Sequence, residues 1–185
     1  MNFLKKHSPL SVRNAPAFTL IELLVVIAII AILMGILFPA AGSAITSAKK
    51  TTARNQAVQI ATAITAYETE YGRLPSNTSG QFDTTLVGTL CTTNDGTNNP
   101  RAVLFLEATA WKSGKGGTNG SGFCDPWGTP YSLRLDTNYA NLLTNMPSQT
   151  NPGSAVTMGT NLTKHVGVWT VFTNGSSQFL INSWD

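Results

Sequence analysis

The stretch that decides the fold is AFTLIE at residues 17–22, which leads into an apolar run over residues 23–38. A transmembrane helix needs about 20 mostly apolar residues, and this segment supplies that length. Glu22 is the one charge within it, and an intramembrane carboxylate is costly unless a positive group is brought close. A cut after Ala17 would create such a group, the free α-amine of Phe18, in the same chain or in a neighbouring copy within a polymer. The sequence therefore predicts a membrane-spanning helix with a functional carboxylate.

The residues before this helix, 1–17, form a polar leader with three basic side chains, Lys5, Lys6 and Arg13. Positive charge just before a membrane span keeps that side in the cytoplasm, so the rest of the chain is expected across the membrane. The whole chain has 12 Lys and Arg against nine Asp and Glu, and loss of the leader leaves nine of each. A nearly neutral mature chain gives no reason to expect nucleic acid as a partner.

The sequence AFTLIELLVVIAII at residues 17–30 closely resembles the class III signal of type IV pilins and type II secretion pseudopilins. In that family, prepilin peptidase cuts before the Phe and methylates the new amine. The resemblance implies cleavage between Ala17 and Phe18, N-methylation of Phe18, and an assembly role for Glu22 opposite a neighbour's amine. The residue before the cut is usually Gly, and Ala17 is small enough to take its place. The alternative is a plain apolar anchor in which Glu22 has no function.

An amphipathic helix is expected to continue over residues 40–71, where apolar side chains recur at steps of mostly three and four: Ile45, Ala48, Ile60, Ala61, Ile64, Tyr67 and Tyr71. Pro39 is expected to kink the helix or open it locally. Gly72 is a plausible C-cap and Pro75 a stop signal. We therefore expect four parts: a leader (1–17), an assembly helix (18–39), its amphipathic continuation (40–72), and a globular loop-plus-sheet domain (73–185).

The globular domain is expected to be a small antiparallel sheet packed on the helix, an α+β, pilin-like fold. The expected strands are 131–135, 165–172 and 178–184, and Asn174-Gly175 is the strongest hairpin signal. A short helix is expected within 81–91. Residues 112–122 are interpreted as a flexible Gly-rich linker and 138–163 as a polar loop, whereas the pattern over 102–111 fits either a helix or a strand.

The sequence DPWGTPY at residues 125–131 predicts a turn that locks a loop to the sheet. Asp125 followed by Pro126 favours a turn in which the carboxylate bonds back to the backbone. Gly128 relieves steric strain, Trp127 and Tyr131 are apolar anchors, and Pro130 completes the motif. Together with YGRLP at 71–75, it resembles the major pseudopilin of type II secretion, where this motif introduces the first strand. The resemblance favours a pseudopilin over a motility pilin and implies a structural role.

Cys91 and Cys124 are the two cysteines, and an even count in an exported protein suggests a disulfide between them. Two unpaired buried thiols are the alternative, and a Cys124–His165 nucleophile pair is a third interpretation. Only two histidines occur, His7 in the leader and His165, so a His-based metal cluster is unavailable. We therefore expect no enzyme activity, and a structural role for His165.

No cofactor is expected, although calcium stays open. Related major pseudopilins bind calcium in a loop near the C-terminus, and calcium needs several hard oxygen ligands that usually include carboxylates. Residues 172–184 contain no Asp or Glu. The stretch offers only neutral oxygens, from Asn174, Ser176, Ser177 and Asn182, and Asp185 is the C-terminal residue.

The resemblance implies a structural subunit of a type II secretion pseudopilus, single-pass in the inner membrane with its C-terminal domain in the periplasm. Its implied partners are other pseudopilins in a polymer, prepilin peptidase, and the inner-membrane assembly platform with its ATPase. One alternative is a type IV pilin for adhesion, motility or DNA uptake. Another is a soluble secreted binding domain or enzyme whose signal sequence is cut near Ala41 or Ala44.

Overall fold

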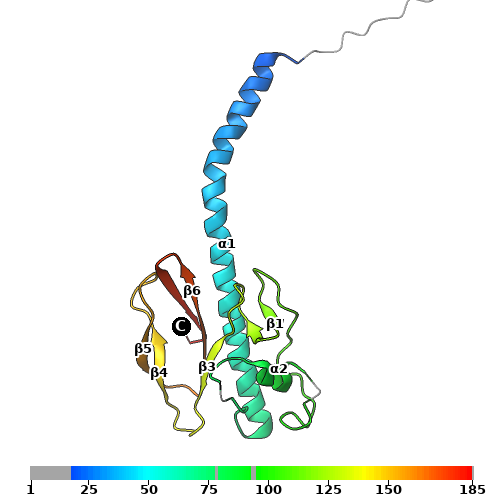
Figure 1. Cartoon of the computed structure of the whole chain (residues 1–185), viewed down its shortest axis with the longest axis vertical. Helices are drawn as coiled ribbons and strands as arrows, with labels where there is room; N and C mark the ends of the chain where they lie inside the picture. The colour runs from blue at the N-terminus through cyan, green and yellow to red at the C-terminus, as the bar shows by residue number, and fades with distance from the viewer. Residues whose placement is uncertain (1–17, 78, 93–94, 185) are drawn as a thin grey trace, which may run out of the picture. The chain divides into compact units, whose positions relative to one another are not determined.

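The computed structural model describes residues 18–184 except 78, 93 and 94 (Figure 1). At residues 39 and 40 it describes the backbone alone. The predicted leader, including Ala17, lies outside the described residues. The chain divides into two compact units, one ending at Ser43 and the other beginning at Ala44. The division falls four residues after the predicted end of the assembly helix.

Helix α1, Leu20–Tyr71, contains 52 residues and runs without a break through positions 39 and 40. In the first unit every described side chain is exposed. The apolar part of α1 has a mean hydropathy of 3.1 over its best window, so by length and composition it could cross a membrane. The long helix confirms the α-helical prediction for residues 20–71.

In the second unit α1 buries one face, with steps of four and three residues between Ala53, Ala57, Ile60, Ile64 and Tyr67. The predicted positions Ala61 and Tyr71 are half-buried. The prediction was wrong for Ile45 and Ala48, which are exposed, because the buried face begins only at Ala53. The helix ends at Tyr71, and Gly72 follows as the expected C-cap, because its φ is 65° and its N–H donates to Glu68 O at 2.7 Å.

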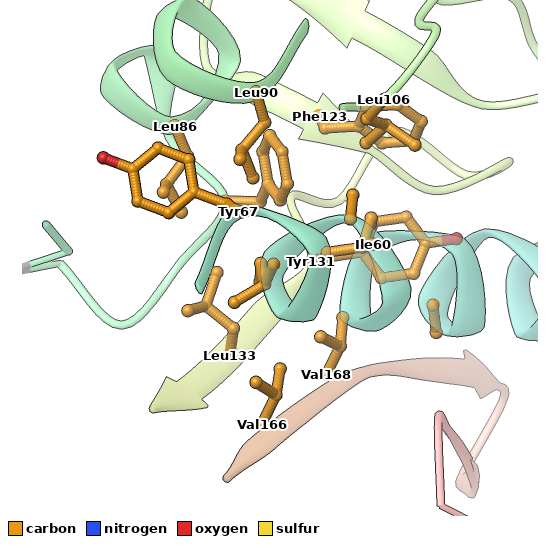
Figure 2. Packing of buried hydrophobic residues seen from close by; sticks show 14 of the residues in the cluster. Ile60, Tyr67, Leu86, Leu90, Leu106, Phe123, Tyr131, Leu133, Val166 and Val168 are labelled. Atoms are coloured by element: carbon orange, nitrogen blue, oxygen red, sulfur yellow. The ribbon is translucent and has the colours of Figure 1, made fainter. Parts of the chain in front are cut away.

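The predicted short helix is α2, Thr84–Cys91. Asp83 caps it, because its Oδ1 accepts hydrogen bonds from the backbone N–H of Thr85 and Leu86, each at 3.1 Å. Leu86 and Leu90 are fully buried. In Figure 2 they point toward Tyr67 of α1, so α2 closes one side of the core.

The main sheet has the order β3-β6-β7 and is antiparallel throughout, with β3 Ser132–Leu135, β6 Val166–Asn174 and β7 Ser177–Asn182. All three strands confirm predicted ones within a few residues. The β6–β7 hairpin is also confirmed, with Asn174 paired to Ser177 and Gly175 at φ 61° in the turn. Val166, Val168 and Leu133 face Ile60 of α1 (Figure 2), which gives the expected α+β fold.

The predicted Gly-rich linker was wrong, because residues 117–124 form a hairpin of β1, Gly117–Asn119, and β2, Gly122–Cys124. The glycines serve close packing. A Cβ on Gly117 would lie 2.5 Å from Thr109 O, and a Cβ on Gly122 would lie 1.9 Å from Phe82 O. Glycine is the one residue that permits such an approach, so it specifies order here instead of flexibility.

The predicted polar loop at 138–163 was also wrong, because it contains an antiparallel ribbon of β4, Leu143–Ser148, and β5, Thr157–Leu162. Leu143 and Met146 are buried beside Gly167 of β6, where there is no side chain to exclude them. Figure 1 shows this ribbon and the main sheet on one side of the second half of α1, with α2 and β1 on the other.

Residues 102–111 form neither a helix nor a strand, apart from one bridge between Ala110 and Thr118. The backbone N–H groups of Phe105 and Leu106 both donate to Leu90 O, at 3.1 and 2.9 Å. Leu106 is buried and joins the core seen in Figure 2. The segment therefore covers the C-terminal end of α2.

Candidate functional site

Glu22 lies in the first turn of α1 and is held by Thr19. Its Oε2 accepts hydrogen bonds from Thr19 N at 2.9 Å and from Thr19 Oγ1 at 2.7 Å, and Glu22 N donates back to Thr19 Oγ1 at 3.3 Å. This reciprocal arrangement is a capping box, which satisfies backbone donors at a helix start. The sequence reasoning missed it, although Thr-x-x-Glu before an apolar run is its usual signature.

The apolar side chains around Glu22 are all exposed. Phe18 is 77% exposed and Leu20 is 88% exposed, and the other residues between 18 and 38 are also exposed. A continuous apolar surface of this kind marks contact with a membrane or with other proteins. Phe18, the predicted new N-terminus, is the first described residue, and its predicted cleavage partner Ala17 lies outside the described part.

Asp125 organises the second predicted motif. Its Oδ1 accepts hydrogen bonds from the backbone N–H of Trp127 and of Thr129, each at 2.9 Å. Its Oδ2 accepts one from the Thr170 hydroxyl of β6 at 2.6 Å. The carboxylate is only 1% exposed, so these three donors replace its water. Asp125 thus closes the turn on itself and ties it to the sheet.

The other members of the motif connect the turn to neighbouring elements. Trp127 stacks on Phe172 of β6 with ring centroids 4.3 Å apart and an interplanar angle of 19°. The Tyr131 hydroxyl lies 2.9 Å from Gln56 Oε1 and 3.1 Å from Ala53 O on α1, and burial raises its pKa.

Each proline of the motif has a backbone contact. Pro126 O accepts from Gly114 N at 2.9 Å, and Pro130 forms a bridge with Cys124. Gly128 adopts a φ of 96° and donates its N–H to Asp125 O at 3.0 Å. All groups of the motif are used in holding the loop, the sheet and α1 together, which is a structural arrangement.

The predicted disulfide is absent, because Cys91 and Cys124 are both free thiols. Cys91 ends α2 and packs against the core, whereas Cys124 lies in β2 with its Sγ 3.9 Å from Gly122 O. Burial raises the pKa of Cys91 to about 12 and also raises the pKa of Cys124. Both stay protonated near neutral pH, and a protonated buried thiol is a poor nucleophile.

His165 faces a carboxylate. Its Nδ1 lies 3.5 Å from Asp136 Oδ2 and makes no hydrogen bond with the described residues. Asp136 is 4% exposed, and its carboxylate also accepts from the backbone N–H of Ala140 and Asn141. Burial raises the pKa of Asp136, but its backbone donors and His165 outweigh this and lower it overall. His165 is therefore tethered beside the start of β6.

The four residues considered for calcium do not fit one ion. Asn174 pairs with Ser177 at the turn, whereas Asn182 pairs with Trp169 at the far end of β7. Ser177 and Asn182 are five positions apart along β7, which is about 17 Å. Asn182 is also only 2% exposed. Within the described ranges, no three or more His, Cys, Asp or Glu side chains gather as metal ligands.

Comparison with known proteins bears on the N-terminal segment. No curated protein and no solved structure matches the chain. A family model described as the prokaryotic N-terminal methylation motif matches residues 12–38. The match contains the candidate cleavage position, Phe18 and Glu22, together with the exposed apolar part of α1. The chain thus carries the prepilin-type N-terminal methylation motif, which supports its assignment to the type IV pilin and pseudopilin family.

Proposed function

We propose that this chain is a structural subunit of a type II secretion pseudopilus, which polymerises through its N-terminal helix and helps to drive protein export across the outer membrane. The observation that carries the proposal is the methylation motif at residues 12–38, joined to a helix that leaves every described side chain of residues 18–38 exposed. The exposed apolar surface of this helix would contact lipid before assembly and the helices of other copies afterwards.

The proposed assembly step pairs opposite charges in an apolar setting. Prepilin peptidase cuts after Ala17 and methylates the amine of Phe18, and that amine meets Glu22 of a neighbouring copy. Thr19 fixes the Glu22 carboxylate at the first turn through its own N–H and hydroxyl. The two charges are costly when separate in the bilayer and much less so when paired. The pairing therefore sets the stagger between subunits.

The rest of the proposed cycle needs no catalysis by this chain. The helix anchors the subunit in the inner membrane, with the leader on the cytoplasmic side and the globular unit in the periplasm. The assembly platform and its ATPase add subunits to the base of the fibre, the apolar helices form its core, and the globular units face outward.

A type IV pilus subunit is the second candidate, because the same N-terminal chemistry serves both systems. The DPWGTPY turn favours the pseudopilus, since it resembles the turn of the major pseudopilin and uses Asp125, Trp127 and Tyr131 in structural contacts. Long surface fibres built from this chain at its native expression level would favour the pilus, and short periplasmic fibres the pseudopilus.

The sharpest test replaces Glu22 by glutamine. A Gln side chain keeps an oxygen that can accept from Thr19, so helix capping survives, but the charge is lost. We expect the Glu22→Gln chain to insert and be cleaved normally yet to form no fibre when prepilin peptidase and the platform are supplied. Glu22→Asp, which keeps the charge, is the matched control and should keep partial assembly. Wild-type fibre yield from Glu22→Gln would mean that Glu22 only caps the helix, and the proposed pairing would be wrong.

A further inference from the structure

Lysine side chains gather at the end of the second unit where that unit begins along α1. Lys49 and Lys50 follow Ala44, the first residue of the unit, by five and six positions. The Cε of Lys49 would lie 3.5 Å from a Cβ placed on Gly114, so Lys49 packs beside the turn at residues 112–115. That turn carries two more lysines, and both are exposed. We call Lys49, Lys50, Lys112 and Lys115 the lysine end.

The turn that presents Lys112 and Lys115 is held in place. Gln56 Nε2 of α1 donates to Lys115 O at 2.7 Å, and Gly114 N donates to Pro126 O at 2.9 Å. Lys115 N also donates to Lys112 O at 3.0 Å. The backbone of the turn is thus fixed to α1 and to the DPWGTPY turn, so the two lysines project from defined positions.

Lys50 connects α1 to half-exposed aromatic rings of the β6–β7 hairpin. Its Nζ lies 3.2 Å from the ring centroid of Phe179 and 5.5 Å from that of Phe172, and ring faces attract an ammonium group. Phe172 also stacks on Trp127, and all three rings are half-exposed. Figure 1 shows the turn of this hairpin at the end of the second unit where α1 begins within it. Tryptophan and lysine side chains are typical anchors at a membrane–water interface.

The elements around the lysine end carry charge of one sign. Residues 44–67, 108–124 and 137–184 contain no Asp or Glu. Asp125 lies nearby, but its carboxylate is only 1% exposed and is already held by three hydrogen bonds. The hollow beside Lys50 is also lined by Arg54, and its other lining residues are uncharged. Within the described residues, the surface of this end is therefore basic.

The accessible carboxylates of the second unit lie elsewhere. Glu68 follows Lys49 by 19 positions along α1, which is about 28 Å. Glu107 lines a hollow whose helix residues lie within 58–66, and it forms no ion pair with any described residue. Charge is thus segregated along the unit, with positive charge gathered where the unit begins.

The chain itself keeps the lysine end close to the predicted membrane span. Lys49 follows Phe38, the last residue of the apolar run, by 11 positions of continuous helix. These positions rise about 16 Å, of which the headgroup layer takes up about 5–8 Å. The remainder is comparable with the Debye length of about 8 Å at physiological ionic strength. This limit holds whatever the angle between the two units.

We propose that the lysine end docks on the anionic phospholipid headgroups of the membrane that anchors the unassembled subunit. The proposal rests on the function proposed above, because it needs the apolar part of α1 to be in a bilayer. The charge, the half-exposed aromatic rings and the position in the chain all favour lipid as the occupant. A second copy is disfavoured because Glu68 shares its hollow with Lys164 and His165, so that carboxylate does not present a uniformly negative face.

This contact orients the globular unit against the bilayer before the subunit joins a fibre. Attraction between lysines and anionic lipids is screened by salt and falls off within a Debye length, so it is reversible. The contact is lost when the subunit leaves the membrane during assembly, and the lysine end then becomes accessible.

The test measures how fast each lysine is acetylated in the full-length chain at high lipid excess. The vesicles contain either phosphatidylcholine alone or phosphatidylcholine with about 30% phosphatidylglycerol, and the reagent is uncharged so that vesicle charge does not exclude it. Peptide mass spectrometry then gives a rate for each amine. We expect Lys112 and Lys115 to react roughly fivefold more slowly on the anionic vesicles. About 0.5 M NaCl should remove the difference.

Lys164 is the internal reference, because it is exposed and lies beside Glu68 at a separate hollow. Its rate should be the same on both kinds of vesicle. In a second full-length chain, Lys112→Gln with Lys115→Gln removes two of the docking charges, so the protection of Lys49 should fall. The matched control Lys164→Gln should leave the protection of Lys49 unchanged. Unchanged tryptophan fluorescence shows that each variant is folded.

Equal rates for Lys112 and Lys115 on neutral and anionic vesicles would overturn the docking proposal. Protection on both kinds of vesicle that rises with protein density would also overturn it, because a second copy would then be the occupant. In either case the proposed function stands as long as the wild-type chain polymerises and Glu22→Gln does not. Failure of the wild-type chain to polymerise with a supplied platform would instead refute the proposed function.

Discussion

Replacing Gly122 by alanine should destabilise the second unit far more than replacing Gly120, two residues earlier. A Cβ at position 122 would lie 1.9 Å from Phe82 O and 2.9 Å from Asp83 Cα, and both are backbone atoms that no side-chain rotation can remove. Gly122 also has a φ of 131°, which L-residues rarely adopt. At Gly120 the space is open, with nothing within 4 Å of the added carbon.

The size of the effect follows from three costs. Backbone strain at a glycine-only conformation costs about 1–3 kcal/mol. Forcing the backbone at Gly122 away from the backbone at Phe82 in a packed region costs about 1–3 kcal/mol more. The hydrogen bond from Phe123 N to Phe82 O, now 3.0 Å long, would be lost at about 1 kcal/mol. The total of about 3–7 kcal/mol is a large part of the 5–15 kcal/mol that typically stabilises a domain.

Urea unfolding of the detergent-solubilised full chain measures this effect through tryptophan fluorescence, because Trp111 lies beside Gly117 of the same hairpin and Trp127 stacks on Phe172 of the main sheet. We expect Gly122→Ala to lower the midpoint strongly or to prevent folding, and Gly120→Ala to change the free energy of unfolding by less than about 0.5 kcal/mol. Equal midpoints for the two variants would refute the reasoning and would return residues 112–122 to the status of a linker.

Three further predictions concern buried polar groups. Thr170→Val removes the 2.6 Å hydroxyl donor to Asp125 Oδ2, so it should cost about 1.5–3 kcal/mol in the same urea assay. Burial raises the pKa of Asp136, but its backbone N–H donors lower the pKa by more than burial raises it, so the net shift is downward. The stabilisation of the fold by the Asp136 carboxylate should be complete above about pH 4 and be lost as the pH falls through the lower folded-state pKa. The midpoint of acid unfolding measures this loss, and Asp136→Asn should shift that midpoint. Cys91 and Cys124 should resist iodoacetamide at pH 8 in the folded chain and react after unfolding, measured by intact mass.

The elements that were predicted correctly are those with a strong local pattern. Helix α1 has a continuous apolar run and then a stripe at steps of three and four, and β6 and β7 flank an Asn-Gly hairpin signal. The glycines of β1 and β2 suggested flexibility, because glycine lowers strand propensity when nothing approaches it closely. Here the carbonyl of Phe82 approaches Gly122, and that contact is formed by residues 40 positions away.

The β4–β5 ribbon was missed for a different reason. β5 is exposed along almost its whole length, so it has no alternation of apolar and polar residues to reveal it. Leu143, Met146 and Pro147 of β4 are buried, and the place of Leu143 and Met146 depends on the absence of a side chain at Gly167. Position 167 can be understood only once the opposing strand is known.

The candidate site shows the same division between local and distant information. The turn at Asp125 was predictable, because Asp-Pro with a nearby glycine is a local turn signal. The hydrogen bond from Thr170 to Asp125 and the stacking of Trp127 on Phe172 were not predictable, since they depend on how β6 packs. The disulfide prediction was wrong because an even cysteine count carries no information on where the thiols lie: Cys91 is half-buried at the end of α2, whereas Cys124 is buried in β2.

The most direct test of the central claim is the intact mass and N-terminal sequence of the chain recovered from membranes. The account predicts a chain that begins at N-methylated Phe18 and therefore keeps the whole apolar part of α1. A chain that begins near Gly42 or Ile45 would contradict it, because the helix proposed to assemble the fibre would have been removed with the signal sequence.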